Sequence, residues 1–161
     1  TPGAASAAHS QNRTVDATDE EHLCQEAFQQ ITAVFEHAWI MKCSSGEARL
    51  FRWDKKLAPN GGHAIVSLAH PSFLRVVSKT HLPYHGFLVD SPIHRVFFSA
   101  LGFSDLPGTV TAVPLKMKSQ LWGFFVATGP ESLSGLDNLS LVESTTQTLA
   151  DAMSEYWQKA S

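Results

Sequence analysis

Residues 109–127 constrain the fold more than any other part of the sequence. They place apolar side chains on both sides of a short polar turn, a pattern that predicts a β-hairpin. Pro114 has no N–H to donate to a neighbouring strand, so we expect it where no such donor is needed. Gly123 predicts a close approach by another part of the chain. Because little in the hairpin can do chemistry, we interpret it as structural framework.

Composition and charge exclude several functional classes. The chain has 161 residues, enough for one domain, and 43% of them are hydrophobic, enough to form a core. Only 17% are charged and the formal net charge is -3, whereas a nucleic-acid-binding protein needs clustered Lys and Arg to neutralise phosphates. No apolar run reaches the roughly 20 residues of a membrane-spanning helix, and no signal-peptide pattern is present. We therefore expect a cytoplasmic protein that binds neither nucleic acid nor membrane.

The start of the chain differs in composition from the rest. Residues 1–19 are rich in Ala, Ser and Thr and carry almost no large apolar side chains, so they cannot offset the entropy lost on ordering. We interpret residues 1–19 as a flexible linker or tail and residues 20–161 as the folded domain. Because the chain begins at Thr1 rather than Met, we also expect a longer parent protein.

Hydrophobic periodicity predicts helices and strands in alternating groups. The expected helices cover about 19–37 (capped at Thr18 or Asp19), 72–82, 92–101 and 134–159, and the expected strands include 38–43 and 48–54. Residues 64–70 fit either a strand or a short buried segment, and residues 83–92 fit an irregular segment or a short strand. This order predicts an α+β domain with an antiparallel sheet, and the first and last helices are placed to pack together.

The last predicted helix carries an apolar stripe. Its members alternate in spacing by three and four residues, which is typical of a core face or of a seam between two helices. The stripe consists of Leu139, Val142, Thr146, Leu149, Met153 and Tyr156. We expect it to form an interface in a homodimer or with a partner signalling protein. The alternative is that it packs on the sheet of its own domain.

The order of elements resembles that of a GAF domain. The resemblance depends mainly on Ala-Val-Pro-Leu at 112–115 and Leu-Trp-Gly at 121–123, followed by a closing helix with Leu-Ser at 133–134. It covers roughly residues 20–158 and implies a central antiparallel sheet flanked by helices, with the terminal helices packed together. A PAS-like or profilin-like sheet arrangement stays open. GAF domains are sensory or regulatory modules; many dimerise through their terminal helices, and some bind small ligands.

The same resemblance places any ligand between one face of the sheet and residues 84–98. There, polar groups stand among aromatic ones, a mixture suited to a small anionic or purine ligand. These candidate pocket residues are His85, Asp90, His94 and Arg95. The sequence identifies no particular ligand or cofactor. In the alternative interpretation, Phe97, Phe98 and Trp122 close the pocket and no ligand binds.

The histidines and cysteines do not predict an enzyme. His81 and His85 are four residues apart but Pro83 lies between them, and no HExxH or CxxC spacing accompanies the eight histidines. GAF-type reductases of free methionine sulfoxide use cysteines in the middle of the domain, where Cys24 and Cys43 do not lie. Neither a metal site nor a catalytic residue is therefore expected.

Residues 85–94 also raise two chemical hypotheses, a haem site and a catalytic triad. A haem needs only one axial histidine in an apolar pocket, for which His85 and His94 are the candidates. Asp90, Ser91 and His94 are too close in sequence to form a catalytic triad readily, and Ser91 before Pro92 is typical of a helix start.

These observations lead to one functional hypothesis and two alternatives. The chain is interpreted as a non-enzymatic GAF-like regulatory module of a bacterial-type signalling protein, dimerising through its terminal helices and able to bind a small ligand. The first alternative is a protein–protein interaction domain with a closed pocket. The second is a thiol- or metal-dependent enzyme.

Overall fold

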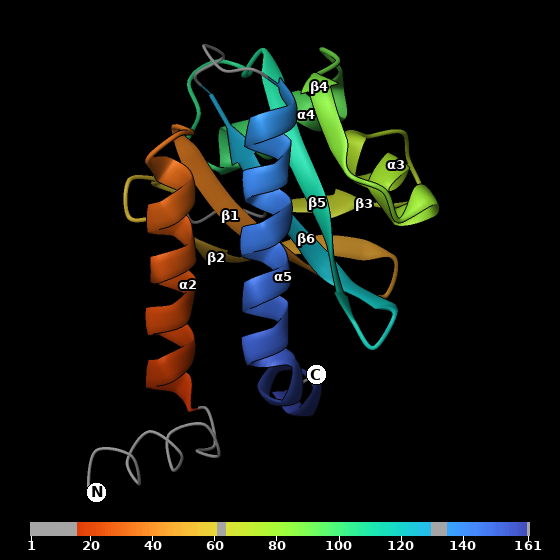
Figure 1. Ribbon diagram of the computed structural model, residues 1–161. Coiled ribbons are helices and arrows are strands. Elements are labelled where there is room, and N and C mark those ends of the chain that lie inside the picture. Colours follow the sequence, from red (N-terminus) through yellow and green to blue (C-terminus); the bar gives the residue numbers. More distant parts are fainter. Residues whose placement is uncertain (1–15, 61–63, 130–134, 161) are drawn as a thin grey trace, which may run out of the picture.

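A six-stranded antiparallel sheet separates two pairs of helices. The computed structural model describes residues 16–60, 64–129 and 135–160. The strand order is β3-β2-β1-β6-β5-β4. The strands are β1 (His37–Ser44), β2 (Glu47–Trp53), β3 (Ile65–Ser67), β4 (Tyr84–Phe87), β5 (Thr109–Met117) and β6 (Gln120–Thr128). The helices are α2 (Ala17–Thr32), α3 (Phe73–Thr80), α4 (Pro92–Ala100) and α5 (Gly135–Ala160). The predicted α+β class, with the first and last helices packed together, is confirmed (Figure 1).

Helix α2 begins earlier than the sequence indicated. Asp16 is its N-cap: the Asp16 side chain accepts a hydrogen bond from the Asp19 N–H at 2.9 Å, and the Asp19 side chain accepts one from the Asp16 N–H at 3.2 Å. This reciprocal capping box satisfies two backbone donors. The predicted cap at Thr18 or Asp19 is therefore wrong, and residues 17–19, assigned to a flexible tail, are helical. Residues 1–15 lie outside the described part of the chain.

The two short helices begin where the sequence predicted. Ser72 caps α3 and Ser91 caps α4, each through a side-chain oxygen that accepts a backbone N–H three residues later. Pro92 occupies the first turn of α4, where its missing N–H costs nothing. The ambiguous segments 64–70 and 83–92 contain the short strands β3 and β4.

Strands β5 and β6 form the predicted hairpin. Their positions in the sheet account for the proline at 114 and the glycine at 123. Strand β4 pairs with β5 only as far as Ala112, so Pro114 lies beyond the end of that partner strand. Gly123 lies against β1: a Cβ built on it would be 2.0 Å from the Met41 carbonyl oxygen. Both expectations are confirmed, and the hairpin connects the central strand β6 to β5, which pairs with the edge strand β4.

Replacing Gly123 with alanine is expected to lower the free energy of unfolding by about 2 kcal/mol, because the added methyl must displace the β1 backbone. Urea denaturation followed by circular dichroism measures this. Gly86→Ala on strand β4 is the matched control, since nothing lies within 4 Å of a Cβ at Gly86. Equal stability of the two variants would contradict the close approach at Gly123.

The sheet divides the core into two apolar layers. On one face, α2 and α5 lie side by side and cover β1, β5 and β6 with Phe28, Ile31 and Met153 among the buried residues. On the other face, α3 and α4 cover a second layer that includes Trp39 and Phe124. Side chains on successive residues of each strand alternate between these layers, as the pleat requires.

The apolar stripe on α5 lies in the first layer. Val142 and Met153 are fully buried, Thr146 and Leu149 are 3% exposed, and Leu139 and Tyr156 are partly buried against the same layer. The stripe therefore packs within its own domain, as the alternative interpretation had it. Its four buried members offer no surface to a second chain.

Candidate functional site

The space between the sheet and helices α3 and α4 is filled by the protein's own aromatic rings. The Trp39 ring centroid lies 6.4 Å from that of Phe97 and 6.0 Å from that of Phe98. Phe73 stacks on Phe98 at 6.1 Å. The Trp39 indole N–H is buried with no described acceptor in reach. These rings occupy the region in which the sequence analysis placed a ligand.

Trp122 does not take part in this closure. It lies on the opposite face of the sheet, where its ring stacks on that of Trp157 at 4.5 Å with an interplanar angle of 9°. The prediction that Trp122 helps to close the pocket is therefore wrong. Leu121 precedes Trp122 in β6 and faces the other layer, so a one-residue difference in strand position decides which side a ring occupies.

Two of the four candidate pocket residues form an ion pair at the surface. The Arg95 guanidinium donates to both carboxylate oxygens of Asp90, at 2.5 and 2.7 Å. Their mutual hydrogen bonds lower the pKa of Asp90 and raise the pKa of Arg95. Both side chains are well exposed, so the pair contributes little to stability.

The other two candidate residues, His94 and His85, lie apart from that pair. His94 is buried and its ring is fully engaged: Nδ1 donates to the Val89 carbonyl at 2.6 Å and Nε2 accepts the Phe73 N–H at 3.3 Å. His85 is on β4, where its Nδ1 lies 2.6 Å from the Thr111 hydroxyl. Thr111 alternates with residues of the second layer, so His85 points to the opposite face of the sheet. The structure thus brings Asp90 and Arg95 together but not the four as one site.

The hydrogen bonds of His94 argue against its role as an axial ligand of a haem. Neither ring nitrogen of His94 is available to bind iron. Nε2 accepts a hydrogen bond from the first N–H of α3, and Nδ1 donates one to a carbonyl in the loop before α4. Among residues 16–60, 64–129 and 135–160, no three His, Cys, Asp or Glu side chains are placed to hold a metal ion. His63 lies outside the described residues.

The two thiols lie in different layers and are poorly ionised. Cys24 on α2 belongs to the first layer and Cys43 on β1 packs against the second. Burial raises the pKa of Cys24 to about 12 and that of Cys43 to about 11. A nucleophilic cysteine needs a lowered pKa, so neither thiol has the character of a catalytic one.

Both cysteines are expected to react slowly with iodoacetamide at pH 8 in the folded protein. With a pKa of about 11, Cys43 holds roughly a hundredfold less thiolate than a free cysteine. Mass spectrometry of timed samples, with the urea-unfolded chain as reference, measures the rates. Labelling of Cys43 as fast in the folded as in the unfolded chain would contradict the buried environment.

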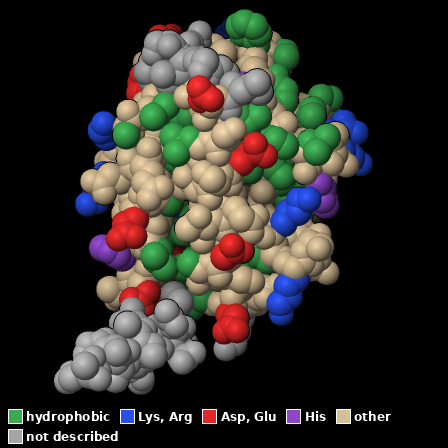
Figure 2. All heavy atoms as spheres, viewed as in Figure 1, with side chains coloured by type: hydrophobic (Ala, Val, Ile, Leu, Met, Phe, Trp, Pro, Cys, Tyr) green, Lys and Arg blue, Asp and Glu red, His purple; other side chains and the backbone are tan. Residues whose placement is uncertain are grey.

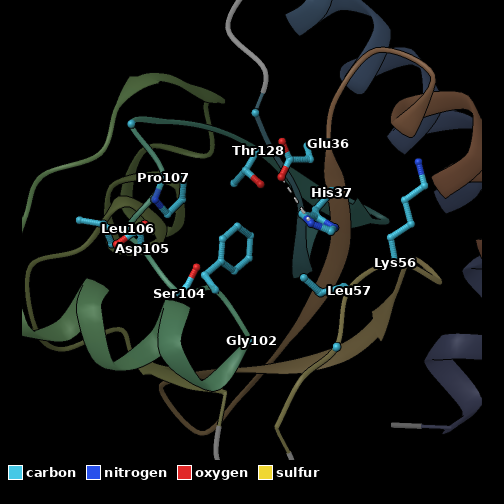
Figure 3. Close-up of a pocket in the computed structure, with 14 residues that line it drawn as sticks. Glu36, His37, Lys56, Leu57, Gly102, Ser104, Asp105, Leu106, Pro107 and Thr128 are labelled. Carbon is cyan, nitrogen blue, oxygen red and sulfur yellow. Dashed lines mark ion pairs between the residues drawn. The ribbon is translucent and has the colours of Figure 1, made fainter.

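The pocket shown in Figure 3 lies at the end of the sheet where β1 starts and β6 ends. Its volume is about 450 Å³. Four chain segments line it: Glu36–His37, Lys56–Ala58, Gly102–Gly108 and Thr128–Gly129. It therefore adjoins both connections between the sheet and the terminal helices, the one after α2 and the one before α5.

Asp54 is not among the described residues that line this pocket, but it holds the lining residues Lys56 and Leu57 against the start of β1. Its carboxylate accepts the N–H groups of Ala38 at 2.8 Å, Lys56 at 2.7 Å and Leu57 at 3.1 Å, which fixes the loop after β2 to the start of β1. The same carboxylate lies 3.4 Å from His37 Nδ1. Its acceptor capacity is used by the fold, so it positions the pocket instead of facing it.

The sequence analysis missed this pocket. Its polar groups come from four segments that are far apart in the chain, and none carries a recognisable spacing. The only local signal was the Leu-Pro-Gly turn at 106–108, which predicts a loop and no chemistry.

No family model matches the sequence, and no curated protein sequence matches it. Solved structures do. The A. aeolicus nlh2 GAF domain, in an inactive state, has a TM-score of 0.62 and 13% identity over 91% of this chain and 89% of that one.

Two other solved structures resemble the chain at similar levels. Residues 122 to 287 of a methyl-accepting chemotaxis protein give a TM-score of 0.62 and 12% identity, covering 84% of this chain and 88% of that one. A type II free methionine-R-sulfoxide reductase from Thermoplasma acidophilum gives 0.59 and 10%, covering 83% and 93%. Likeness at such identities concerns the fold, and the strand order and helix placement agree with it. The chain has a GAF-like fold.

Proposed function

We propose that this chain is a non-enzymatic regulatory module that acts through the outer face of α2 and α5 on another protein. The observation that carries the proposal is the position of the two terminal helices. They pack together on one side of the sheet, and both connect to it at the end where β1 starts and β6 ends. A partner that binds and displaces these helices would therefore also displace the two central strands. The chemotaxis protein of similar fold supports a regulatory role, and the raised thiol pKa values argue against cysteine chemistry like that of a reductase.

A buried polar contact makes α2 and α5 one unit. The Trp157 indole N–H on α5 donates to the Glu20 carboxylate on α2 at 2.8 Å, and Glu20 also pairs with Arg52 on β2. Glu20 is 2% exposed and Trp157 is 1% exposed. Two helices and a strand therefore share one charged group inside the protein, and displacement of one helix is transmitted to the other.

The outer face of this pair is acidic. The exposed acidic side chains of the two helices include Glu21, Glu26, Asp137, Glu143, Asp151 and Glu155, and no Lys or Arg is present among the described side chains of α2 and α5. Figure 2 shows Asp and Glu on this face, with Lys and Arg at its margins. Such a surface attracts a partner that carries Lys or Arg.

The predicted homodimer is the competing arrangement. Because the stripe from Val142 to Met153 is buried, a second copy that contacts α2 and α5 meets their acidic outer face, which brings like charges together. We therefore propose that a basic surface of another protein binds the acidic outer face of α2 and α5. Whether the chain instead forms a homodimer is tested below.

The test uses a fluorescent amphipathic helical peptide with lysines along one face, and the same peptide with glutamine in place of lysine. The lysine peptide is expected to bind more tightly, and Glu143→Gln with Asp151→Asn to weaken it about fivefold, from two exposed contacts of about 0.5 kcal/mol each. Glu47→Gln on β2 is the matched control. Equal weakening by the control, or no preference for lysine, would overturn the acidic-face proposal.

Native mass spectrometry of the same sample tests the competing arrangement. A single unassociated chain at low ionic strength is the expected result, because the like-charged faces repel. A stable dimer that Ser144→Arg on the outer face of α5 dissociates would replace the basic partner with a second copy.

A further inference from the structure

The charges of the pocket in Figure 3 favour a cation. Among the described residues that line it, Glu36 and Asp105 are exposed carboxylates and Lys56 is the one Lys or Arg. Lys56 extends away from Glu36, His37 and Thr128, which lie together (Figure 3). The Glu36 carboxylate has one described ionic neighbour, His37 Nε2 at 3.8 Å, and its side chain is 66% exposed. It is therefore accessible to a bound group.

A buried hydroxyl in the same wall lacks a partner. Thr128 is 2% exposed and lines the pocket, and its Oγ1 has no described donor or acceptor in reach. An unsatisfied buried hydroxyl costs about 1–3 kcal/mol, so a group that supplies a hydrogen bond there is stabilised. The backbone beside it is already used, since the Glu36 N–H donates to the Thr128 carbonyl at 2.9 Å. The Thr128 and Glu36 side chains lie next to each other on the same side of the pocket (Figure 3).

The opposite wall is aromatic and apolar. The partly buried Phe103 ring meets the His37 ring edge-on, with centroids 5.4 Å apart, and Leu106 and Pro107 continue this wall. An aromatic ring attracts a cation to its face by about 0.5–2 kcal/mol and accommodates an apolar body. The pocket therefore combines acceptors at one side with an apolar surface at the other.

We propose that this pocket binds a small organic cation, a primary amine with an apolar body. The ammonium donates to the Glu36 carboxylate and the Thr128 hydroxyl, and the apolar part lies against Phe103. A volume of about 450 Å³ is within the range of small-molecule sites. The aromatic interior behind Trp39 takes no part.

The position of the pocket gives binding a consequence, which rests on the proposed function. Glu36 and His37 follow α2, and Thr128 and Gly129 precede α5. Gly129 has φ +57°, and a Cβ on it would lie 3.1 Å from the Glu36 Cβ, so the two connections are in close contact. An amine held between them shifts the population of arrangements of the two helices.

Benzylamine is the probe, and benzyl alcohol is its uncharged counterpart of the same shape. Titration of ¹⁵N-labelled protein is expected to give saturable shifts of the His37, Phe103, Thr128 and Gly129 amides with benzylamine. Glu36→Gln is expected to weaken binding about tenfold, and Thr128→Val about threefold, from loss of a charged and a neutral hydrogen bond. The control Glu26→Gln, on the outer face of α2, leaves the affinity unchanged.

Three outcomes would overturn the site. They are equal affinity for benzyl alcohol, unchanged affinity in Glu36→Gln, and the absence of saturation at millimolar benzylamine, which would leave water as the occupant of the pocket. Circular dichroism of each variant establishes that it folds. Because the lysine peptide tests the helical face and benzylamine tests the pocket, failure of either proposal is distinguishable from failure of the other.

Discussion

Replacing Phe98 with alanine is expected to lower the free energy of unfolding by about 4 kcal/mol. Phe98 is 1% exposed, and its ring contacts those of Trp39, Phe73, Phe97 and Phe103 at centroid distances of 6.0, 6.1, 5.1 and 5.3 Å. Removing it leaves a cavity that these four rings cannot close without leaving their own positions. Urea denaturation monitored by Trp fluorescence and circular dichroism measures the loss.

Phe87→Ala is the matched control for this substitution. Phe87 is 79% exposed on the edge strand β4, so its removal is expected to change stability by no more than about 0.5 kcal/mol. A loss below about 1 kcal/mol in Phe98→Ala would show that the interior is not packed as described.

Replacing Glu20 with alanine is expected to cost about 3 kcal/mol. The substitution removes the acceptor of the buried Trp157 N–H and leaves the Arg52 guanidinium without its carboxylate. Arg52 can turn toward water because its side chain is 39% exposed, so the loss lies at the lower end for a buried ion pair. Thermal and urea unfolding measure it.

Conservative changes separate the two contacts that Glu20 makes. Glu20→Gln keeps an oxygen for the Trp157 N–H but places an NH2 group where the carboxylate oxygen faces Arg52, so it loses the ion pair and is expected to be less destabilising than Glu20→Ala. Glu21→Ala, next in sequence and exposed, is the control and is expected to be near neutral. Equal effects of Glu20→Ala and Glu21→Ala would mean that the helices are not held together through Glu20.

Much of the fold followed from local sequence signals. Ser72, Ser91 and Pro92 predicted helix starts because a cap depends on residues within one turn. Gly123 predicted a close backbone approach because strand positions rarely use glycine otherwise. The cap of α2 was misplaced because Asp16, Thr18 and Asp19 all suit a cap, and the choice depends on which pair completes a reciprocal box.

Long-range features were less predictable. The spacing of Val142, Leu149 and Met153 indicated burial, but periodicity does not tell a sheet from a second helix as the covering surface. Sequence proximity grouped His85 with His94, although strand alternation places His85 on the other side of the sheet. Thr128 and Glu36 meet only because β1 pairs with β6, which no local pattern reveals.

The most direct test of the central claim is a map of the lysine peptide on ¹⁵N-labelled protein by amide chemical shifts. The account predicts that the shifted amides belong to the outer face of α2 and α5, including Glu143 and Asp151, and that added salt reverses the shifts. Shifts centred on the exposed apolar residues Val76, Phe87 and Val89 would contradict it, because the contact surface would then lie on the other helices and the edge strand.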